Sequence, residues 1–185
     1  MDFITGLPKV FGKDCIFVVV DKITKFANLF VVTTTFTASQ VAKLFFKEVF
    51  RLHGLPKSII SDKVSIFFSA FWQELFKMAE KIVTPSTRYH PQTDGQTDRV
   101  NQWLEFYLRN YVSGNKKAWI KWLNLGDSCY NTTFHMSISM YPFKSLYVYD
   151  ASTFIDHIFC VIIAPNAKDW IEKSQEILKV LKDNL

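Results

Sequence analysis

The sequence predicts a single α/β domain, and three observations support this fold class. Residues 15–20 form a continuous apolar run rich in β-branched side chains, which is typical of a strand buried on both faces. Residues 26–32 repeat that character. Farther along, apolar side chains recur every three or four residues, the spacing of helices that bury one stripe. A chain of 185 residues that is 49% hydrophobic and 16% aromatic can bury a substantial core.

The first 32 residues predict three strands joined as an antiparallel meander. The first strand begins at Asp2, and the runs at 15–20 and 26–32 supply the other two. Residues 12–14, which begin with a glycine, supply the turn that precedes the second strand.

A helix is predicted to begin after Thr37. Thr37 and Gln40 have the spacing of a capping box, in which each side chain binds the backbone N–H of the other residue. Gly54, followed by Pro56, predicts the end of this helix. Its inward stripe is predicted to be Val41, Leu44, Phe45, Val49 and Leu52.

The middle of the chain predicts two short strands and a helix. Residues 58–61 are predicted to form a strand that ends just before Asp62. Reacting groups in α/β sheets often lie at such strand ends. Ser69 is the predicted cap of the helix that follows, and residues 82–83 form the next strand. The inward side chains of the helix are predicted to be Phe71, Trp72, Leu75, Phe76 and Met78.

The second half of the chain is predicted to be helical. A polar loop at 85–96 leads to a helix that starts near Thr97. Residues 116–130 and 142–146 predict two further helices, and an amphipathic helix is predicted at 169–185. The helix starting near Thr97 places on one face the polar side chains of Asp98, Asn101, Gln102 and Glu105.

Charge and composition narrow the class of protein. The formal charge of +5 favours an anionic partner such as nucleic acid, although no basic block is present. The longest apolar runs are too short to cross a bilayer, and no secretion signal precedes Asp2, so we expect neither membrane attachment nor secretion. The three cysteines show no paired spacing, as in a reducing compartment.

Three carboxylates suggest a metal site. Asp2 opens the chain, Asp62 follows a predicted strand, and 35 residues separate Asp62 from Asp98. Carboxylates of this kind hold two divalent metals in enzymes that transfer phosphoryl groups. Hard oxygen ligands suit Mg²⁺ or Mn²⁺. Asp21 is the rival to Asp2 as first ligand, and Asp62 has the alternative role of capping a helix or turn.

Several segments of the chain resemble the catalytic core of gypsy-type LTR-retrotransposon integrases, members of the retroviral integrase (D,D-35-E) family. Together they cover roughly residues 1–150. They are Met1-Asp2-Phe3-Ile4 with Gly6-Leu7-Pro8, Val18-Val19-Val20-Asp21-Lys22, His53 to Asp62, Phe68-Ser69 with Phe71-Trp72, Tyr89 to Asn101, and Tyr130-Asn131-Thr132-Thr133.

The resemblance implies an RNase H-like fold, with a five-stranded mixed sheet flanked by helices on both faces. It implies that Asp2, Asp62 and Asp98 are the catalytic residues and the ligands of a two-metal Mg²⁺ or Mn²⁺ site. It also implies dimers or higher oligomers and a place in the host nucleus, after synthesis in the cytoplasm. The residues that it assigns to contact with the element ends and target DNA are Tyr89, Pro91, Gln92, Gly95, Arg99, Asn101 and Gln102.

The resemblance also sets the expected domain boundaries, and the chain departs from the family at one site residue. Residues 1–150 are expected to be the core, truncated at its N-terminus, and residues 151–185 a linker and helix leading toward a missing C-terminal domain. The family has glutamate where Asp98 stands. The shorter side chain retracts the carboxylate by about 1 Å, a misplacement that can cost on the order of a hundredfold in rate.

Three functions therefore stay open. The first is a metal-dependent polynucleotidyl transferase that processes 3′ ends and joins them to target DNA, impaired at Asp98. The second is a catalytically inactive remnant that binds DNA or itself, and the third is an RNase H-type nuclease. The candidate partner surface consists of Phe71, Trp72, Trp119 and Trp122, unless these side chains are internal.

Overall fold

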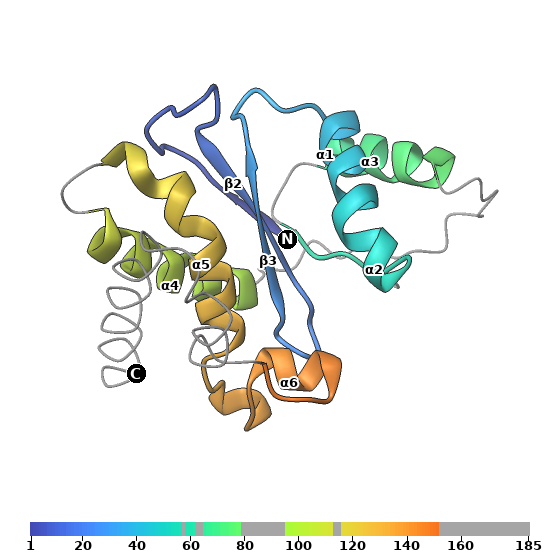
Figure 1. Cartoon of the computed structure of the whole chain (residues 1–185). Helices are drawn as coiled ribbons and strands as arrows, with labels where there is room; N and C mark the ends of the chain where they lie inside the picture. The colour runs from blue at the N-terminus through green and yellow to red at the C-terminus, as the bar shows by residue number, and fades with distance from the viewer. Residues whose placement is uncertain (57, 62–64, 79–94, 113–115, 152–185) are drawn as a thin grey trace, which may run out of the picture. The chain divides into compact units, whose positions relative to one another are not determined.

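The computed structural model describes residues 1–56, 58–61, 65–78, 95–112 and 116–151. Figure 1 labels the helices and strands of the chain, which divides into two compact units. Unit 1 comprises Met1–Val20 and Asn28–Asn124, and unit 2 comprises Asp21–Ala27 and Leu125–Leu185. The expected boundary near residue 150 borders the undescribed residues 152–185, so the predicted linker and final helix lie outside the described part of the chain.

Three strands form the described sheet, in the order β1-β2-β3. They are β1 (Asp2–Ile4), β2 (Cys15–Val20) and β3 (Ala27–Val32). β1 runs antiparallel to β2, with Asp2 opposite Val18 and Ile4 opposite Ile16. The predicted meander is confirmed. Burial of both faces explains the unbroken apolar run, because the first four residues of β2 have no exposed surface.

The expectation of five strands in a mixed sheet is not met within the described residues, which contain three antiparallel strands. Instead of a strand at 58–61, only Ile60 makes a bridge. Its carbonyl oxygen accepts a hydrogen bond from the Met1 ammonium group at 2.6 Å. This contact lies next to the start of β1. The predicted strand at 82–83 lies outside the described residues.

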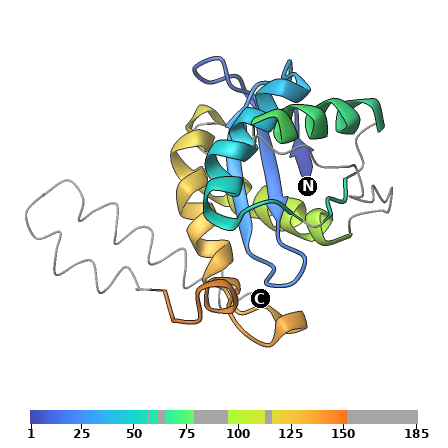
Figure 2. The same ribbon diagram turned by 90° about the vertical axis from the view of Figure 1, so that its right-hand side faces the viewer.

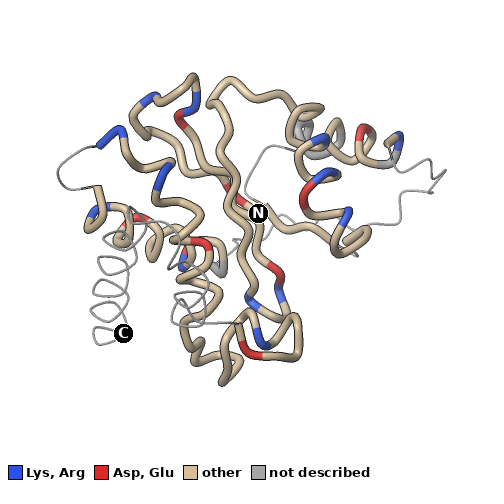
Figure 3. Tube along the Cα trace, in the orientation of Figure 1, with Lys and Arg blue, Asp and Glu red and all other residues tan. Residues whose placement is uncertain are grey.

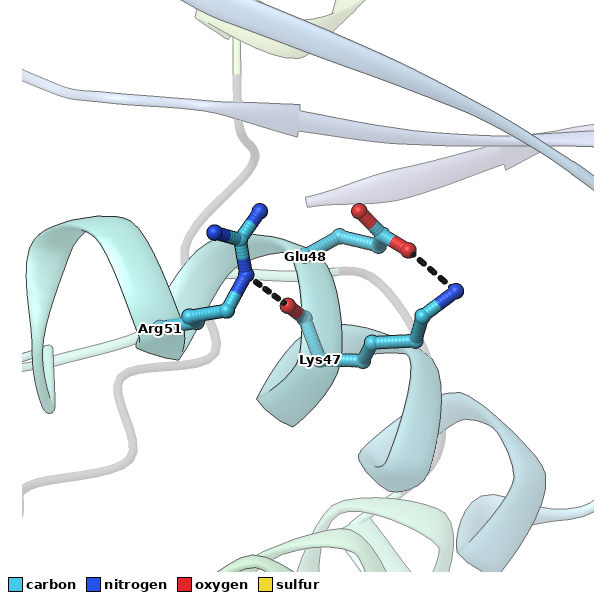
Figure 4. A network of polar contacts seen from close by, with 3 residues as sticks. All are labelled: Lys47, Glu48 and Arg51. Atoms are coloured by element: carbon cyan, nitrogen blue, oxygen red, sulfur yellow. Dashed lines mark hydrogen bonds and ion pairs between the residues drawn. The ribbon is translucent and has the colours of Figure 1, made fainter.

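The first helix begins as predicted, at the capping box. Gln40 N donates to Thr37 Oγ1 at 3.2 Å, and Thr37 N donates to Gln40 Oε1 at 2.9 Å. Helix α1 (Ala38–Phe45) continues through a π-helical turn (Phe46–Phe50) into α2 (Arg51–His53). Figure 4 shows the surface of that turn, where the Lys47 ammonium group forms an ion pair with the Glu48 carboxylate. The backbone carbonyl of Lys47 accepts a hydrogen bond from Arg51 Nε.

The π-helical turn changes which side chains face inward. Val41, Phe45 and Val49 are buried as predicted, whereas Leu52 is 55% exposed. One extra residue in the turn rotates everything after it, so Leu52 leaves the stripe that simple three- and four-residue spacing predicts. The helix ends at Gly54, whose φ of 76° favours glycine.

Helix α3 (Ser65–Met78) packs against α1, with the rings of Phe45 and Phe71 edge to face at 5.6 Å. Ser69 lies inside this helix, so the predicted cap is wrong; the helix begins four residues earlier. Phe71 and Leu75 are fully buried as predicted, and Trp72 and Met78 are partly buried. The side chain of Phe76 lies outside the part of the chain that the structure describes.

Helix α4 (Gly95–Tyr111) begins two residues before the predicted start, and α5 (Trp119–Asn131) follows a 3-10 turn at Lys116–Ala118. Within unit 1, α1, α2 and α3 lie on one side of the strands and α4 on the other (Figures 1 and 2). Trp119 donates its indole N–H to the Pro8 carbonyl at 2.8 Å and is 1% exposed. Since Phe71 and Trp119 are both buried, neither can form the partner surface.

Unit 2 is organised around a backbone clamp and an aromatic cluster. Asn131 pairs with both backbone groups of Ala27, accepting from N at 2.9 Å and donating to O at 2.8 Å. The predicted short helix is confirmed as α6 (Pro142–Tyr147). Its Phe143 and Tyr147 contact the ring of Phe26 at centroid distances of 6.5 and 5.6 Å.

The surroundings of the Asp127 carboxyl group predict an unusual dependence of the protein's stability on pH. It lies one turn before Asn131, which donates to it at 3.2 Å. Burial raises the pKa of Asp127 to about 7, and the hydrogen bond from Asn131 lowers it by less. The folded chain therefore keeps a proton that the unfolded chain loses near pH 4. The free energy of unfolding should fall as the pH rises from about 4 to about 7.

Replacing Asp127 by Asn should remove this fall in the free energy of unfolding, because the amide does not ionise. We expect Asp127→Asn to be more stable than the native chain at pH 8, by up to about 4 kcal/mol, and to differ least near pH 4. Urea unfolding of both proteins at pH 4.5 and pH 8 measures the difference. An equal difference at the two pH values would contradict the raised pKa.

Candidate metal and nucleic-acid site

Two predicted site elements meet at the start of β1. Asp2 is the first residue of this strand, and its side chain receives two hydrogen bonds. The N–H of Phe3 donates to Oδ1 at 2.7 Å, and the side-chain amide of Asn101, in α4, donates to Oδ2 at 2.5 Å. The contact joins residues 99 positions apart. It brings the first predicted carboxylate beside the helix that carries the third.

Asp98 lies in the first turn of α4, one turn before Asn101, and is exposed. Residues three apart in a helix share a face, so Asp98 and Asn101 lie on the same side of α4. Val100 and Leu104 are fully buried and anchor the helix within unit 1. A carboxylate in the first turn also stabilises the helix by interacting with its dipole.

Asp62, the second predicted ligand, lies outside the described residues. The segment just before it is described: Ile60 contacts Met1 at 2.6 Å, and Ser61 is 1% exposed. The structure therefore brings residue 60 next to residue 1, and residue 101 next to residue 2. Residues 60 and 101 therefore both lie next to the start of β1.

The donor set suits a hard divalent cation. The two hydrogen bonds to the Asp2 side chain come from neutral N–H groups, and among the described residues neither Asp2 nor Asp98 forms an ion pair with a lysine or arginine. The negative charge of both side chains is thus available to a cation. The described residues contain no group of three acidic, histidine or cysteine side chains that could hold a metal, and Asp62 is not among them.

The rival first carboxylate, Asp21, has a structural contact in unit 2. Its Oδ2 accepts from the N–H of Thr24 at 2.8 Å and from the Thr24 hydroxyl at 2.7 Å. These bonds close the turn between β2 and β3, where the backbone of Lys25 has a φ of 62°. This geometry is typical of an aspartate that caps a turn.

The predicted DNA-contacting residues divide into three groups. Tyr89, Pro91 and Gln92 lie outside the described residues. Gly95 is the first residue of α4, and Arg99 and Gln102 are exposed on the same helix. Asn101 differs, because its amide is half-buried and binds Asp2. Figure 3 shows the lysines and arginines spread along the described chain without a basic block.

A separate pocket of about 410 Å³ lies at the other ends of β1 and α4. It contains none of the predicted site residues. Its lining includes Ile4, Pro8, Leu108, Arg109, Val112 and Trp119. None of the described helices is long and apolar enough to cross a membrane.

Comparison with known structures gives the class of fold. The chain is similar to the HTLV-2 integrase catalytic core domain, solved in complex with magnesium in a trimeric form. The TM-score is 0.56 at 16% sequence identity, and the match covers 77% of this chain and 92% of the integrase core. The α/β fold is therefore of the retroviral integrase-core type.

Comparison with known sequences gives particular relatives. The chain is 39% identical over 183 residues to the transposon Tf2-3 and Tf2-4 polyproteins of Schizosaccharomyces pombe. The match covers 98% of this chain and 13% of each polyprotein. The chain is thus homologous to a region of the Tf2 retrotransposon polyprotein, as the resemblance to retrotransposon integrases led us to expect. No family model matches it.

Proposed function

We propose that this chain is the catalytic core of a retrotransposon integrase, a divalent-metal-dependent polynucleotidyl transferase weakened at its third carboxylate. The observation that carries the proposal is the hydrogen bond from Asn101 to Asp2, which joins the first predicted ligand to the helix of the third. The integrase-core fold and the homology to a retrotransposon polyprotein support it.

In this proposal Asp2, Asp62 and Asp98 hold Mg²⁺ or Mn²⁺. When bound, two such ions activate the attacking oxygen and stabilise the leaving oxygen of a phosphoryl transfer. The side chains of Arg99 and Gln102, exposed on α4 beside Asp98, would contact the DNA backbone. The same role falls to Gly95 at the start of the helix and to the predicted loop residues Tyr89, Pro91 and Gln92.

The proposed partners are the element ends, the target DNA and further copies of the chain, and the proposed place of action is the host nucleus. The integrase core that shares this fold is described with magnesium and as a trimer. Phe71 and Trp119 are buried, so a contact between copies must use other residues.

A second candidate function is a catalytically inactive remnant that keeps the fold and its DNA or self-association. The observation in its favour is Asp98, which is exposed and has a shorter side chain than the family's glutamate.

Strand joining on a branched oligonucleotide, with Mg²⁺ or Mn²⁺, tests the proposal. We expect slow but measurable joining by the native chain, and none by Asp2→Asn or Asp62→Asn, because each substitution replaces a negative ligand with a neutral amide. Product that persists in both variants would show that these carboxylates do not carry the reaction. Absence of product from the native chain and from Asp98→Glu would favour the remnant.

A further inference from the structure

Exposed apolar side chains are concentrated in one stretch of unit 2. Among the described residues, eleven large apolar side chains are exposed, and seven of them fall between residues 134 and 149. These seven, which we call the apolar surface of unit 2, are Phe134, Met136, Met140, Tyr141, Tyr147, Val148 and Tyr149. Apolar side chains gathered in this way mark a contact site more often than single exposed ones do.

Hydrogen bonds and ring contacts hold the backbone under this surface. The N–H of His135 donates to the Met140 carbonyl at 3.0 Å and closes the loop that carries Met136. The rings of Phe134 and Tyr141 meet edge to face at 5.9 Å across the base of this loop. The apolar groups are therefore presented to solvent by an ordered part of the chain.

The exposure of Val148 is costly. Its φ of 70° lies in the left-handed region, which is rare for a β-branched residue. It forms the C-cap of α6, a position that glycine favours, and its side chain is 86% exposed. Strain of this kind usually persists where further contacts hold the residue. A segment that covers Val148 would supply such contacts.

The charges within this stretch neutralise each other. Between residues 132 and 150 the sequence has one lysine and one acidic residue. These two, Lys144 and Asp150, form an ion pair at 2.9 Å. Binding to nucleic acid draws on lysine and arginine side chains that are free to neutralise phosphates. The apolar surface therefore suits an apolar partner rather than DNA.

The sequence that follows the surface is itself apolar. Nine of the eleven residues at 154–164 are apolar, and four residues separate this segment from Tyr149. The segment lies outside the described part of the chain. A tether this short gives an effective concentration on the order of millimolar. A second copy of the chain at about micromolar concentration would compete poorly with it.

We propose that residues 154–164 fold back onto the apolar surface of unit 2 within the same chain. Both parts gain from the contact, because each large apolar side chain that leaves water contributes stabilisation. The contact would also fix the direction in which residues 165–185 leave unit 2. The inference does not depend on the metal site, so it stands or falls separately from the proposed function.

Hydrogen exchange of the full chain, followed by mass spectrometry, tests the inference. The test variant combines Met136→Lys with Val148→Asn, because these side chains are 84% and 86% exposed and asparagine tolerates the left-handed backbone. Met136→Lys alone is a milder second variant. The matched control is Phe11→Lys, which replaces an apolar side chain that is 95% exposed on unit 1. Slow exchange of the β2 amides verifies that each variant is folded.

We expect the amides of residues 154–164 to exchange about tenfold or more slowly in the native chain than in an unstructured peptide of the same sequence. This protection should fall by about tenfold in the test variant, because two apolar contacts are lost. It should stay native in Phe11→Lys and on dilution of the protein. Absence of protection in the native chain, or full protection in the test variant, would overturn the inference. Protection that disappears on dilution would also overturn it, since a second copy would then cover the surface.

Discussion

Replacing Asp98 by Glu should raise strand joining by on the order of a hundredfold. The added methylene advances the carboxylate by about 1 Å, and a misplacement of that size costs about this factor in catalysis. Asp98 is exposed in the first turn of α4, so the longer side chain has room. The charge at the helix start is unchanged, so the helix should be equally stable.

The rates of the native chain and Asp98→Glu are compared on one branched oligonucleotide with Mg²⁺. Asp98→Asn is the matched control, since it keeps the native length but removes the charge, and it should be inactive. A native rate equal to that of Asp98→Glu would show that the aspartate is no handicap, and the account of impairment would be wrong.

Replacing Phe71 by Ala should cost about 3–5 kcal/mol of stability, the usual loss for a fully buried phenylalanine. Phe71 has no exposed surface and packs against Phe45 at 5.6 Å and Trp72 at 5.9 Å. The Phe45 contact joins α3 to α1, so its loss weakens the packing between these two helices of unit 1. For a chain of this length the melting temperature should fall by roughly 6–20 °C.

Calorimetric melting of Phe71→Ala beside Leu52→Ala separates burial from hydrophobicity. Leu52 belonged to the predicted inward stripe but is 55% exposed after the π-helical turn. Its replacement should change stability by no more than about 0.5 kcal/mol. A large loss in Leu52→Ala would contradict the register of this helix.

Local features of the fold could be predicted from the sequence. The capping box of Thr37 and Gln40 is confirmed because its hydrogen bonds join residues three apart, and the apolar run of β2 is confirmed because burial on both faces requires it. Leu52 could not be placed correctly, since a π-helical turn has no recognised signal in this sequence. The predicted helix cap at Ser69 was wrong because a serine that can cap a helix can also lie inside one.

The motifs named the candidate site residues but could not show which of them touch. Motif spacing indicated Asp2 and Asp98, and the contact between β1 and α4 supports their proximity. The hydrogen bond between Asn101 and Asp2 was not predicted. The position of Asn101 one turn after Asp98 was visible, but a hydrogen bond between residues 99 apart depends on how the whole sheet and helix pack, which local patterns do not reveal.

The most direct test of the central claim is a crystal structure of the native chain grown with Mn²⁺, read from the anomalous difference map. The account predicts a peak about 2.1–2.2 Å from a carboxylate oxygen of Asp2, on the side facing Asp98, with Asn101 still bound to the other oxygen. A map with no peak at Asp2, or with manganese bound elsewhere and Asp2 unligated, would contradict it.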